Sequence, residues 1–225
     1  MLFKTRGIAL NYIKYRESSI IVRIYTERFG LQSYIVNNVR SIKAKSKIAL
    51  YQPLTLLDLV VYHKETVSIH RISEIKCFTP LQSVPYDFKK SCIALFLTEV
   101  LVRTIKEEEG NLELFNFLFN AVLTLDHLDH GFENFHLQFL LAFAGFLGFL
   151  PESADSLVQE LYVKHADAQL TSWIKELMES TFLTPLAFTN DQRREILNLL
   201  MKFYEHHVEG LGEIKSLEVL KEIMT

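Results

Sequence analysis

Glycine and proline are scarce in this chain of 225 residues, with 8 and 5 copies. This scarcity excludes collagen-like and low-complexity sequences. The two cysteines, Cys77 and Cys92, are too few for a disulfide framework or a four-thiolate zinc site, and we expect both to be small apolar residues of the core. The first residues contain no apolar run, so we predict no signal peptide and expect a cytoplasmic protein.

Catalytic and membrane motifs are also missing. The glycines are too far apart for a phosphate-binding loop, and no Gly-x-Ser-x-Gly sequence occurs. The longest apolar stretch, residues 139–150, has 12 residues, whereas a membrane span needs about twenty. We therefore expect no enzyme, no cofactor and no membrane contact. We interpret 139–150 as a central helix buried on all sides, with Gly145 and Gly148 allowing close helix approach.

Charge is divided unevenly along the chain. Residues 1–85 carry a net charge of +8 and residues 86–225 a net charge of −11. The change coincides with the Pro80–Pro85 segment, where the sequence pattern also changes. A basic segment beside an acidic one indicates an anion-binding module joined to a second domain.

The basic segment has the periodicity of strands. Ile20, Val22 and Ile24 alternate with polar residues, which is typical of one buried face. In the last strand Val67 and Ile69 are expected to face inward, before a bulge shifts the register toward Ile72 and Ile75. The five predicted strands cover residues 3–16, 19–25, 31–37, 54–63 and 66–77. Such a set predicts a small barrel of the OB-fold type.

The acidic segment has helical periodicity instead. Gly110 is expected to end one helix, Asn111 to cap the next, and Thr189 or Asn190 to cap a later one. The predicted class is therefore α+β. We expect a five-stranded OB-fold nucleic-acid-binding domain at 1–80, a linker at 81–85 and an all-α helical domain at 86–225.

Basic side chains along the barrel are the candidate DNA ligands, because each contact between a cation and a phosphate releases condensed counterions. These candidates are Lys4, Arg6, Lys14, Arg16, Arg23, Arg28, Arg40, Lys43, Lys45 and Lys47. We place the last three in an extended loop. Because they alternate with other residues, their side chains would lie on one side of that loop and bind phosphate together. The tyrosines among them at positions 12, 15, 25, 34 and 51 could stack on bases, although each one alone is better interpreted as a core residue.

A second group of polar residues lies between two predicted helices. It comprises Asp126, His127, Asp129, His130, Glu133 and His136. Carboxylates and imidazoles at this density could hold a metal ion and activate water, which leaves a metal-dependent hydrolase as an alternative. The spacing matches no metal motif, and we favour a polar loop without metal. An RNA-binding OB-fold module is a further alternative.

Seven short segments form an ordered set along the chain: Thr5–Leu10, Tyr15–Ser19, Tyr25–Gly30, Leu50–Leu54, Leu97–Glu99, Glu108–Phe115 and Gly148–Pro151. Together they resemble the bacterial recombination mediator family RecO. Many relatives carry four zinc-binding cysteines after the central helix, whereas residues 152–182 contain none. The resemblance therefore implies a member without a zinc finger.

The resemblance implies a role in DNA repair and homologous recombination. Such proteins bind single- and double-stranded DNA, anneal complementary strands and, with RecR, help to load RecA onto strands coated by single-stranded DNA-binding protein. It implies RecF as a further partner, the C-terminal tail of single-stranded DNA-binding protein as a ligand, and a nucleoid-associated location. The tail is acidic with an apolar end, so its pocket needs basic residues, and we favour the pairs Arg103 with Lys106 and Arg193 with Arg194 in the helical domain.

Overall fold

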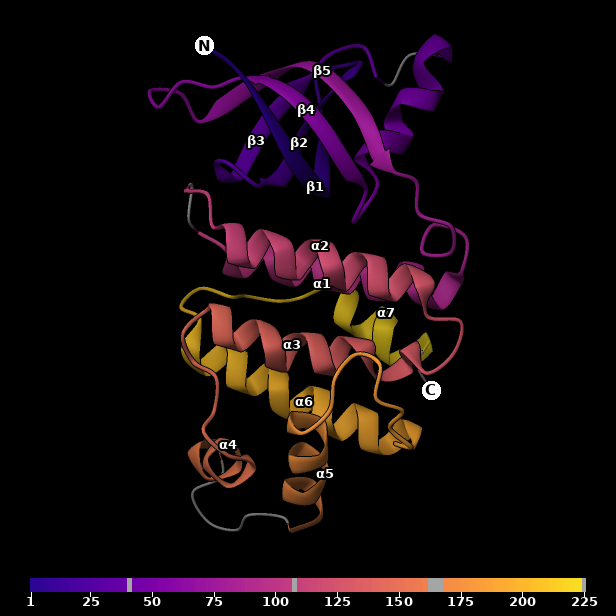
Figure 1. Cartoon of the computed structure of the whole chain (residues 1–225), viewed down its shortest axis with the longest axis vertical. Coiled ribbons are helices and arrows are strands. Elements are labelled where there is room, and N and C mark those ends of the chain that lie inside the picture. The colour runs from indigo at the N-terminus through magenta and orange to yellow at the C-terminus, as the bar shows by residue number, and fades with distance from the viewer. Residues whose placement is uncertain (40–41, 107–108, 162–167, 224–225) are drawn as a thin grey trace.

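The computed structural model describes residues 1–39, 42–106, 109–161 and 168–223 (Figure 1). The barrel consists of β1 (Leu2–Tyr15), β2 (Ser19–Thr26), β3 (Gly30–Val36), the 3-10 helix η1 (Ile42–Tyr51), β4 (Leu56–Tyr62) and β5 (Ile69–Thr79). The helical part consists of α1 (Phe88–Thr104), α2 (Leu112–His127), the 3-10 helix η2 (Phe132–Asn134), α3 (Phe135–Phe146), α4 (Ala154–Leu161), α5 (Ala168–Met178), α6 (Asn190–His207) and α7 (Ser216–Ile223).

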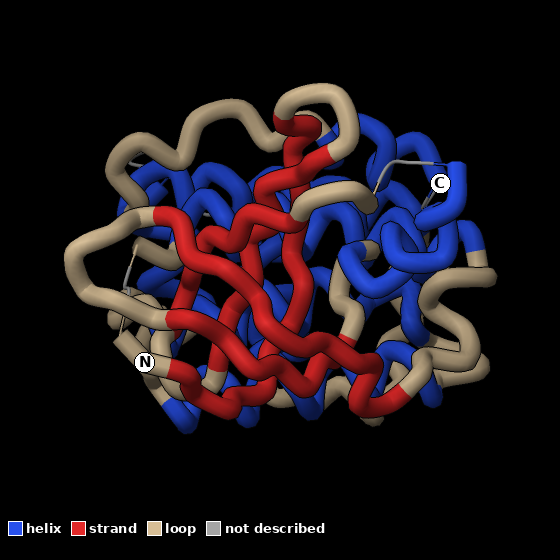
Figure 2. Tube along the Cα trace, turned by 90° about the horizontal axis from the view of Figure 1, so that it is seen from above, coloured by secondary structure: helices blue, strands red, loops and turns tan. Residues whose placement is uncertain are grey.

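The five strands close into a barrel in the order β1-β2-β3-β5-β4. All neighbours are antiparallel except β3 and β5. The long strand β1 pairs with both β2 and β4, and a register shift between Ala9 and Asn11 bends it from one partner to the other. Seen from above, the strands lie over a base of helices (Figure 2). This architecture confirms the predicted OB-type barrel followed by helices.

Alternation along the strands fills the barrel as the sequence predicts. The predicted inward face of β2, Ile20, Val22 and Ile24, is fully buried. Gly7 allows a close approach, because a Cβ there would lie 2.7 Å from Ile24 Cγ2 and 2.8 Å from Leu59 Cδ1. The core of the barrel therefore depends on a strand position without a side chain.

The start of β5 differs from the prediction. Val67 precedes the strand and Ile69 begins it, and both side chains are exposed rather than inward. The predicted bulge is present: the register with β4 shifts between Val60 and Val61, and Ile72 and Ile75 pack against the barrel core. The inward alternation starts with His70, which is 4% exposed, so the strand begins one residue out of the expected phase.

The helices lie in layers below the barrel (Figure 1). α1 and α2 lie next to the strands, α3 and α6 form the next layer, and α4 and α5 lie at the far end. Asn111 caps α2 as predicted, and Thr189 caps α6 in a capping box with Gln192.

The predicted central helix has the expected length of 12 residues but lies four residues nearer the N-terminus. α3 covers Phe135–Phe146 and is buried along most of its length, whereas Leu150, beyond its end, is 54% exposed. Gly148 has a positive φ of 84° and a Cβ there would meet no atom within 4 Å, so it ends the helix in the left-handed conformation. Gly145 also has room for a side chain. The expectation that these glycines allow close helix approach is therefore wrong.

The barrel and the helices share one apolar cluster. Its barrel members are Ile8, Leu10, Tyr25, Leu54 and Leu56, which pack with residues of α1, α2 and α3. The Tyr25 ring stacks on Phe115 of α2, with ring centroids 6.4 Å apart. The turn between β2 and β3 also meets the helical part, because a Cβ on Gly110 would lie 2.4 Å from the carbonyl oxygen of Arg28. Gly110 thus serves this contact and does not end α1, which stops at Thr104.

Gly110→Ala should destabilise the junction between the barrel and the helices. The new methyl group meets backbone atoms, which cannot rotate away as a side chain can, so we expect a loss of about 1–3 kcal/mol in the free energy of unfolding. Urea unfolding measures it. Gly145→Ala is the matched control. Gly145 lies in α3, and a Cβ there would contact only Leu150, at an ordinary distance of 3.7 Å, so we expect alanine to stabilise the protein slightly through its higher helix propensity. Equal stability of the two variants would show that the Gly110 turn yields without cost.

Candidate nucleic-acid interface

The outer face of β1, β2 and β3 carries an apolar row between basic residues. Ile13, Ile21 and Ile35 stand opposite one another on the three strands, and Arg71 of β5 is opposite Ile35. Arg23 lies two residues from Ile21 on the same face of β2. Lys14 follows Ile13 near the end of β1 and pairs with the inward Ile20, so its side chain leaves β1 on the other side and is exposed at the edge of this face. Arg23, Arg71 and Lys14 are exposed, and none has an ion pair within the described ranges. We call Arg23, Arg71 and the isoleucine row, together with the exposed Lys14 at its edge, the β2 face.

Arg16 is also near the β2 face, in the hairpin between β1 and β2. Its guanidinium lies over the Tyr15 ring, 5.1 Å from the centroid, and its φ is positive at 51°. The structure therefore brings together three of the predicted DNA ligands, Lys14, Arg16 and Arg23, and adds Arg71. The sequence prediction missed Arg71 because the phase of β5 was assigned incorrectly.

Lys4 and Arg6 lie in a different place, a groove of about 510 Å³ on the outer side of β1, β4 and β5. This groove contains both signs of charge. Arg6 donates to the Glu27 carboxylate at 2.7 and 3.0 Å, and Lys76 pairs with Asp58 at 3.3 Å. The hydrogen bond with Arg6 lowers the pKa of Glu27, and the same bond raises the pKa of Arg6.

Arg6 joins the barrel to the helices. Its guanidinium also lies over two rings of α2, 5.0 Å from the Phe115 centroid and 5.3 Å from that of Phe119. A guanidinium with a bidentate carboxylate and two aromatic faces has little remaining capacity for phosphate. We therefore leave Arg6 out of the candidate interface.

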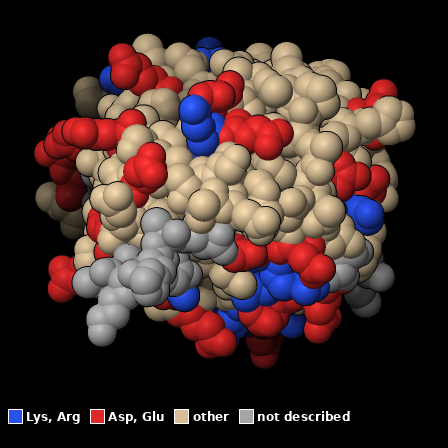
Figure 3. All heavy atoms as spheres, turned by 90° about the horizontal axis from the view of Figure 1, so that it is seen from below, with Lys and Arg blue, Asp and Glu red and all other residues tan. Residues whose placement is uncertain are grey.

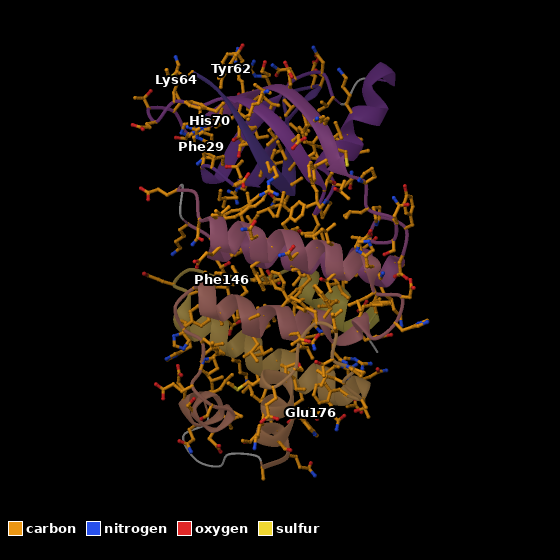
Figure 4. All side chains as sticks on the ribbon, in the orientation of Figure 1. Phe29, Tyr62, Lys64, His70, Phe146 and Glu176 are labelled. Atoms are coloured by element: carbon orange, nitrogen blue, oxygen red, sulfur yellow. The ribbon has the colours of Figure 1, made fainter. Side chains whose placement is uncertain are left out.

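Arg28 belongs to an aromatic group at the rim of the barrel. Its guanidinium lies 4.5 Å from the Phe3 centroid, and Phe29 stacks on His63 with centroids 4.0 Å apart. His63 in turn stacks on His70 at 4.5 Å. Figure 4 shows Phe29 and His70 close together beside the strands. The Arg28 side chain remains exposed, so it stays a candidate phosphate ligand.

The segment with Lys43, Lys45 and Lys47 is the 3-10 helix η1 and not an extended loop. The alternation that would point all three the same way requires extended backbone, so that argument does not hold. Lys47 is exposed, whereas Arg40 and the side chains of Lys43 and Lys45 lie outside the described residues.

Three of the five tyrosines are core residues. Tyr25, Tyr34 and Tyr51 are at most 2% exposed, and burial raises the pKa of Tyr51 to about 12. Only Tyr12 and Tyr15 are partly exposed. The structure therefore places the buried three out of reach of bases.

The polar group at 126–136 does not form a site. Asp126 is 6% exposed and its carboxylate accepts hydrogen bonds from the backbone N–H groups of Gln82, Ser83 and Val84 at 2.8, 2.8 and 2.9 Å. Burial raises the pKa of Asp126, but these hydrogen bonds outweigh it, so the pKa lies below its ordinary value. Asp126 thus holds the linker between the two parts of the chain.

Other residues of that group lie in different environments. His136 is buried, and burial together with the Arg193 charge lowers its pKa to about 3, whereas Asp129 and His130 are exposed in the loop. α2 ends at His127, so the helical spacing of Asp126 and His130 is lost. Within the described part of the chain, no three His, Cys, Asp or Glu residues are placed to hold a metal ion.

The candidate tail-docking residues are separated in the helical part. Lys106 donates to the Glu209 carbonyl at 3.0 Å, and Arg103 is exposed on α1. Arg193 and Arg194 lie together with Lys221 at a small depression that Leu197 and Leu220 also line. Arg193 donates to the Phe188 carbonyl and the Asn190 side chain, and Arg194 pairs with Asp191 at 3.4 Å.

Models of known protein families match both parts of the chain. The family models described as "Recombination protein O N terminal" and "Recombination protein O C terminal" match residues 1–81 and 85–168. The DNA repair protein RecO of Flavobacterium psychrophilum is 37% identical over the whole length of both chains. Those of Bacteroides fragilis and Flavobacterium johnsoniae are 37% and 36% identical, over 99% and 100% of both chains.

The chain belongs to the RecO family.

This RecO family member is thereby placed among DNA repair and recombination proteins. In the described ranges, no helix has the length and apolar character needed to cross a membrane. Figure 3, which views the molecule from the helical end, shows acidic side chains spread over that end. In a family of DNA repair proteins, the more basic barrel is therefore the better candidate for contact with DNA.

Proposed function

We propose that this RecO family member binds single- and double-stranded DNA through the β2 face and anneals complementary strands. The observation that carries the proposal is the set of exposed cations Lys14, Arg23 and Arg71 beside the isoleucine row, none of which has an ion pair among the described residues. Phosphates neutralised there release counterions, and two strands held on one cationic surface repel each other less. Arg28, in the turn between β2 and β3, and Lys47 of η1 are further exposed cations of the barrel. The proposed action makes and breaks no covalent bond and needs no cofactor.

In the same proposal, the protein acts with RecR to help load RecA onto strands coated by single-stranded DNA-binding protein, with RecF as a further partner. The helical part would dock the acidic C-terminal tail of that coating protein. Arg193, Arg194 and Lys221 support this, because these three cations lie close together at one place on the helical part and an acidic segment can contact them. The place of action would be the nucleoid in the cytoplasm.

A strand-annealing experiment tests the proposal. Two complementary oligonucleotides, each coated with the cognate single-stranded DNA-binding protein, are mixed with and without the full-length protein. We expect the protein to accelerate duplex formation, and the acceleration to fall as salt rises. Unchanged annealing at low salt would overturn the annealing function. A competition experiment with RNA of the same sequence separates DNA binding from an RNA-binding module, because RNA that competes equally well would favour the latter.

A further inference from the structure

Tyr62 occupies an unusual position for an aromatic residue of this barrel. It is the last residue of β4, its side chain is 49% exposed, and it stands opposite Leu2 of β1 and Arg71 of β5. Directly opposite residues of an antiparallel pair have Cβ atoms about 4.5–5.5 Å apart and share one face of the sheet. A planar phenol ring and a planar guanidinium are therefore neighbours on the outer surface.

The inner side of the same strand ends is fixed by stacked rings. His63 follows Tyr62 and His70 precedes Arg71, and the two imidazoles stack with centroids 4.5 Å apart while Phe29 covers His63. Because neighbouring strand residues point to opposite faces, this inner stack holds the backbone from which Tyr62 and Arg71 point outward. The ring stack therefore holds the backbone on both sides of the loop between β4 and β5, and the positions of Tyr62 and Arg71 are fixed.

The surroundings of the pair suit a nucleic acid. Arg71 and the nearby Lys64 have no acidic partner within the part of the chain that the structure describes, and the loop between β4 and β5 contains one acidic residue, Glu65. Exposed Leu2 and Ile69 add apolar surface beside the ring. Figure 4 shows Tyr62 and Lys64 at the end of the barrel farthest from the helices, where a long ligand meets no obstruction from them.

We infer that Tyr62 and Arg71 form a stacking site for an unpaired base of single-stranded DNA. The base would lie on the Tyr62 ring or the Arg71 guanidinium, and Lys64 would be available to the adjacent phosphate. Aromatic rings accept every base, so the site has no sequence preference. The same site distinguishes unpaired from paired strands, because bases within a duplex are not available for stacking on a protein surface. This inference rests on the proposed DNA binding and extends the β2 face across Arg71 to β4.

The test combines a protein variant with a DNA variant. Affinities of the full-length protein and of Tyr62→Ala are measured for a single-stranded oligonucleotide and for an abasic oligomer of equal length. We expect Tyr62→Ala to bind the intact oligonucleotide roughly 5- to 100-fold more weakly. We expect the same change to have little effect on the abasic oligomer or on duplex DNA. Tyr62→Phe should retain the affinity, and Tyr86→Ala is the control, because Tyr86 is 82% exposed outside the barrel.

Three results would overturn the inference. The first is unchanged affinity of Tyr62→Ala for the intact oligonucleotide, and the second is an equal loss on the abasic oligomer. The third is a change in sedimentation of the protein alone on Tyr62→Ala, which would assign the exposed surface to contact between copies of the chain. If the unaltered protein binds DNA with steep salt dependence in these cases, only the stacking site fails. If it binds no DNA at low salt, the proposed function itself fails.

Discussion

Asp126→Ala should lower the free energy of unfolding by about 3 kcal/mol or more. The carboxylate of Asp126 accepts three backbone N–H groups of the linker, and its removal leaves these donors, of which the Val84 N–H is buried, without that acceptor. Lys90, which is 2% exposed, donates to Ser83 Oγ at 2.6 Å and to the backbone carbonyl of Asp126 at 3.2 Å. The carbonyl remains in the alanine variant, but the Ser83 hydroxyl that Lys90 contacts loses its hydrogen bond to the carboxylate. Urea unfolding followed by circular dichroism measures the change.

Asp129→Ala is the matched control for this variant. It removes an acidic residue three positions away that is exposed, so we expect a change within about 0.5 kcal/mol. A loss of stability equal to that of Asp126→Ala would show that local charge, and not the linker contact, is responsible. If Asp126→Ala instead keeps its stability, the linker hydrogen bonds contribute little, and the contact between barrel and helices depends on the apolar cluster alone.

Acid should weaken the same contact in the unaltered protein. The folded-state pKa of Asp126 lies below its ordinary value of 3.8, so its carboxylate stabilises the fold above that pH. The stabilisation is lost as the pH falls from that value through the folded pKa, because the group must then bind a proton. The stability difference between the unaltered protein and Asp126→Asn should therefore be largest near neutral pH and shrink below pH 3.8. A difference that stays constant down to pH 2 would contradict this assignment.

Much of the fold could be predicted because its signals are local. The alternation of Ile20, Val22 and Ile24 places β2 in the barrel, and the side-chain cap of Asn111 places the start of α2. The errors also have local causes. The inward phase of β5 starts with His70, because Val67 precedes the strand and Ile69 begins it with an exposed side chain. The end of α3 depends on the left-handed conformation of Gly148 rather than on hydrophobicity.

The candidate site was harder to predict, because a sequence shows which residues are charged but not which of them form ion pairs in the fold. Arg6 and Glu27 are 21 residues apart and meet only after β1 and β2 pair, and the rings over Arg6 come from α2. Asp126 reaches the linker across more than 40 residues. Arg71 joins Arg23 through β3 and β5, a parallel pairing that leaves no signal in local periodicity. Such contacts follow from topology, so the sequence could identify the basic barrel but not its unpaired cations.

Replacing Lys14, Arg23 and Arg71 together by Ala should weaken DNA binding strongly without affecting the fold. All three side chains are exposed and have no ion pair within the described ranges, so each change should move the free energy of unfolding by less than about 0.5 kcal/mol. The three lost phosphate contacts should lower the affinity for single strands by tens- to hundreds-fold at about 50 mM salt. They should also flatten the plot of log affinity against log salt by about 2 for single strands.

A second triple variant separates the β2 face from net charge. Lys89, Lys175 and Lys215 are exposed on the helical part, so their replacement by Ala changes the total charge equally but leaves the β2 face intact. If net charge alone attracts DNA, the two triple variants will lose affinity to the same extent. If the β2 face binds the phosphates, only the variant on the barrel will lose both affinity and salt slope, for every sequence alike, because phosphate contacts carry no base information. An unchanged salt slope in the barrel variant would move the phosphate contacts to Arg28 and Lys47.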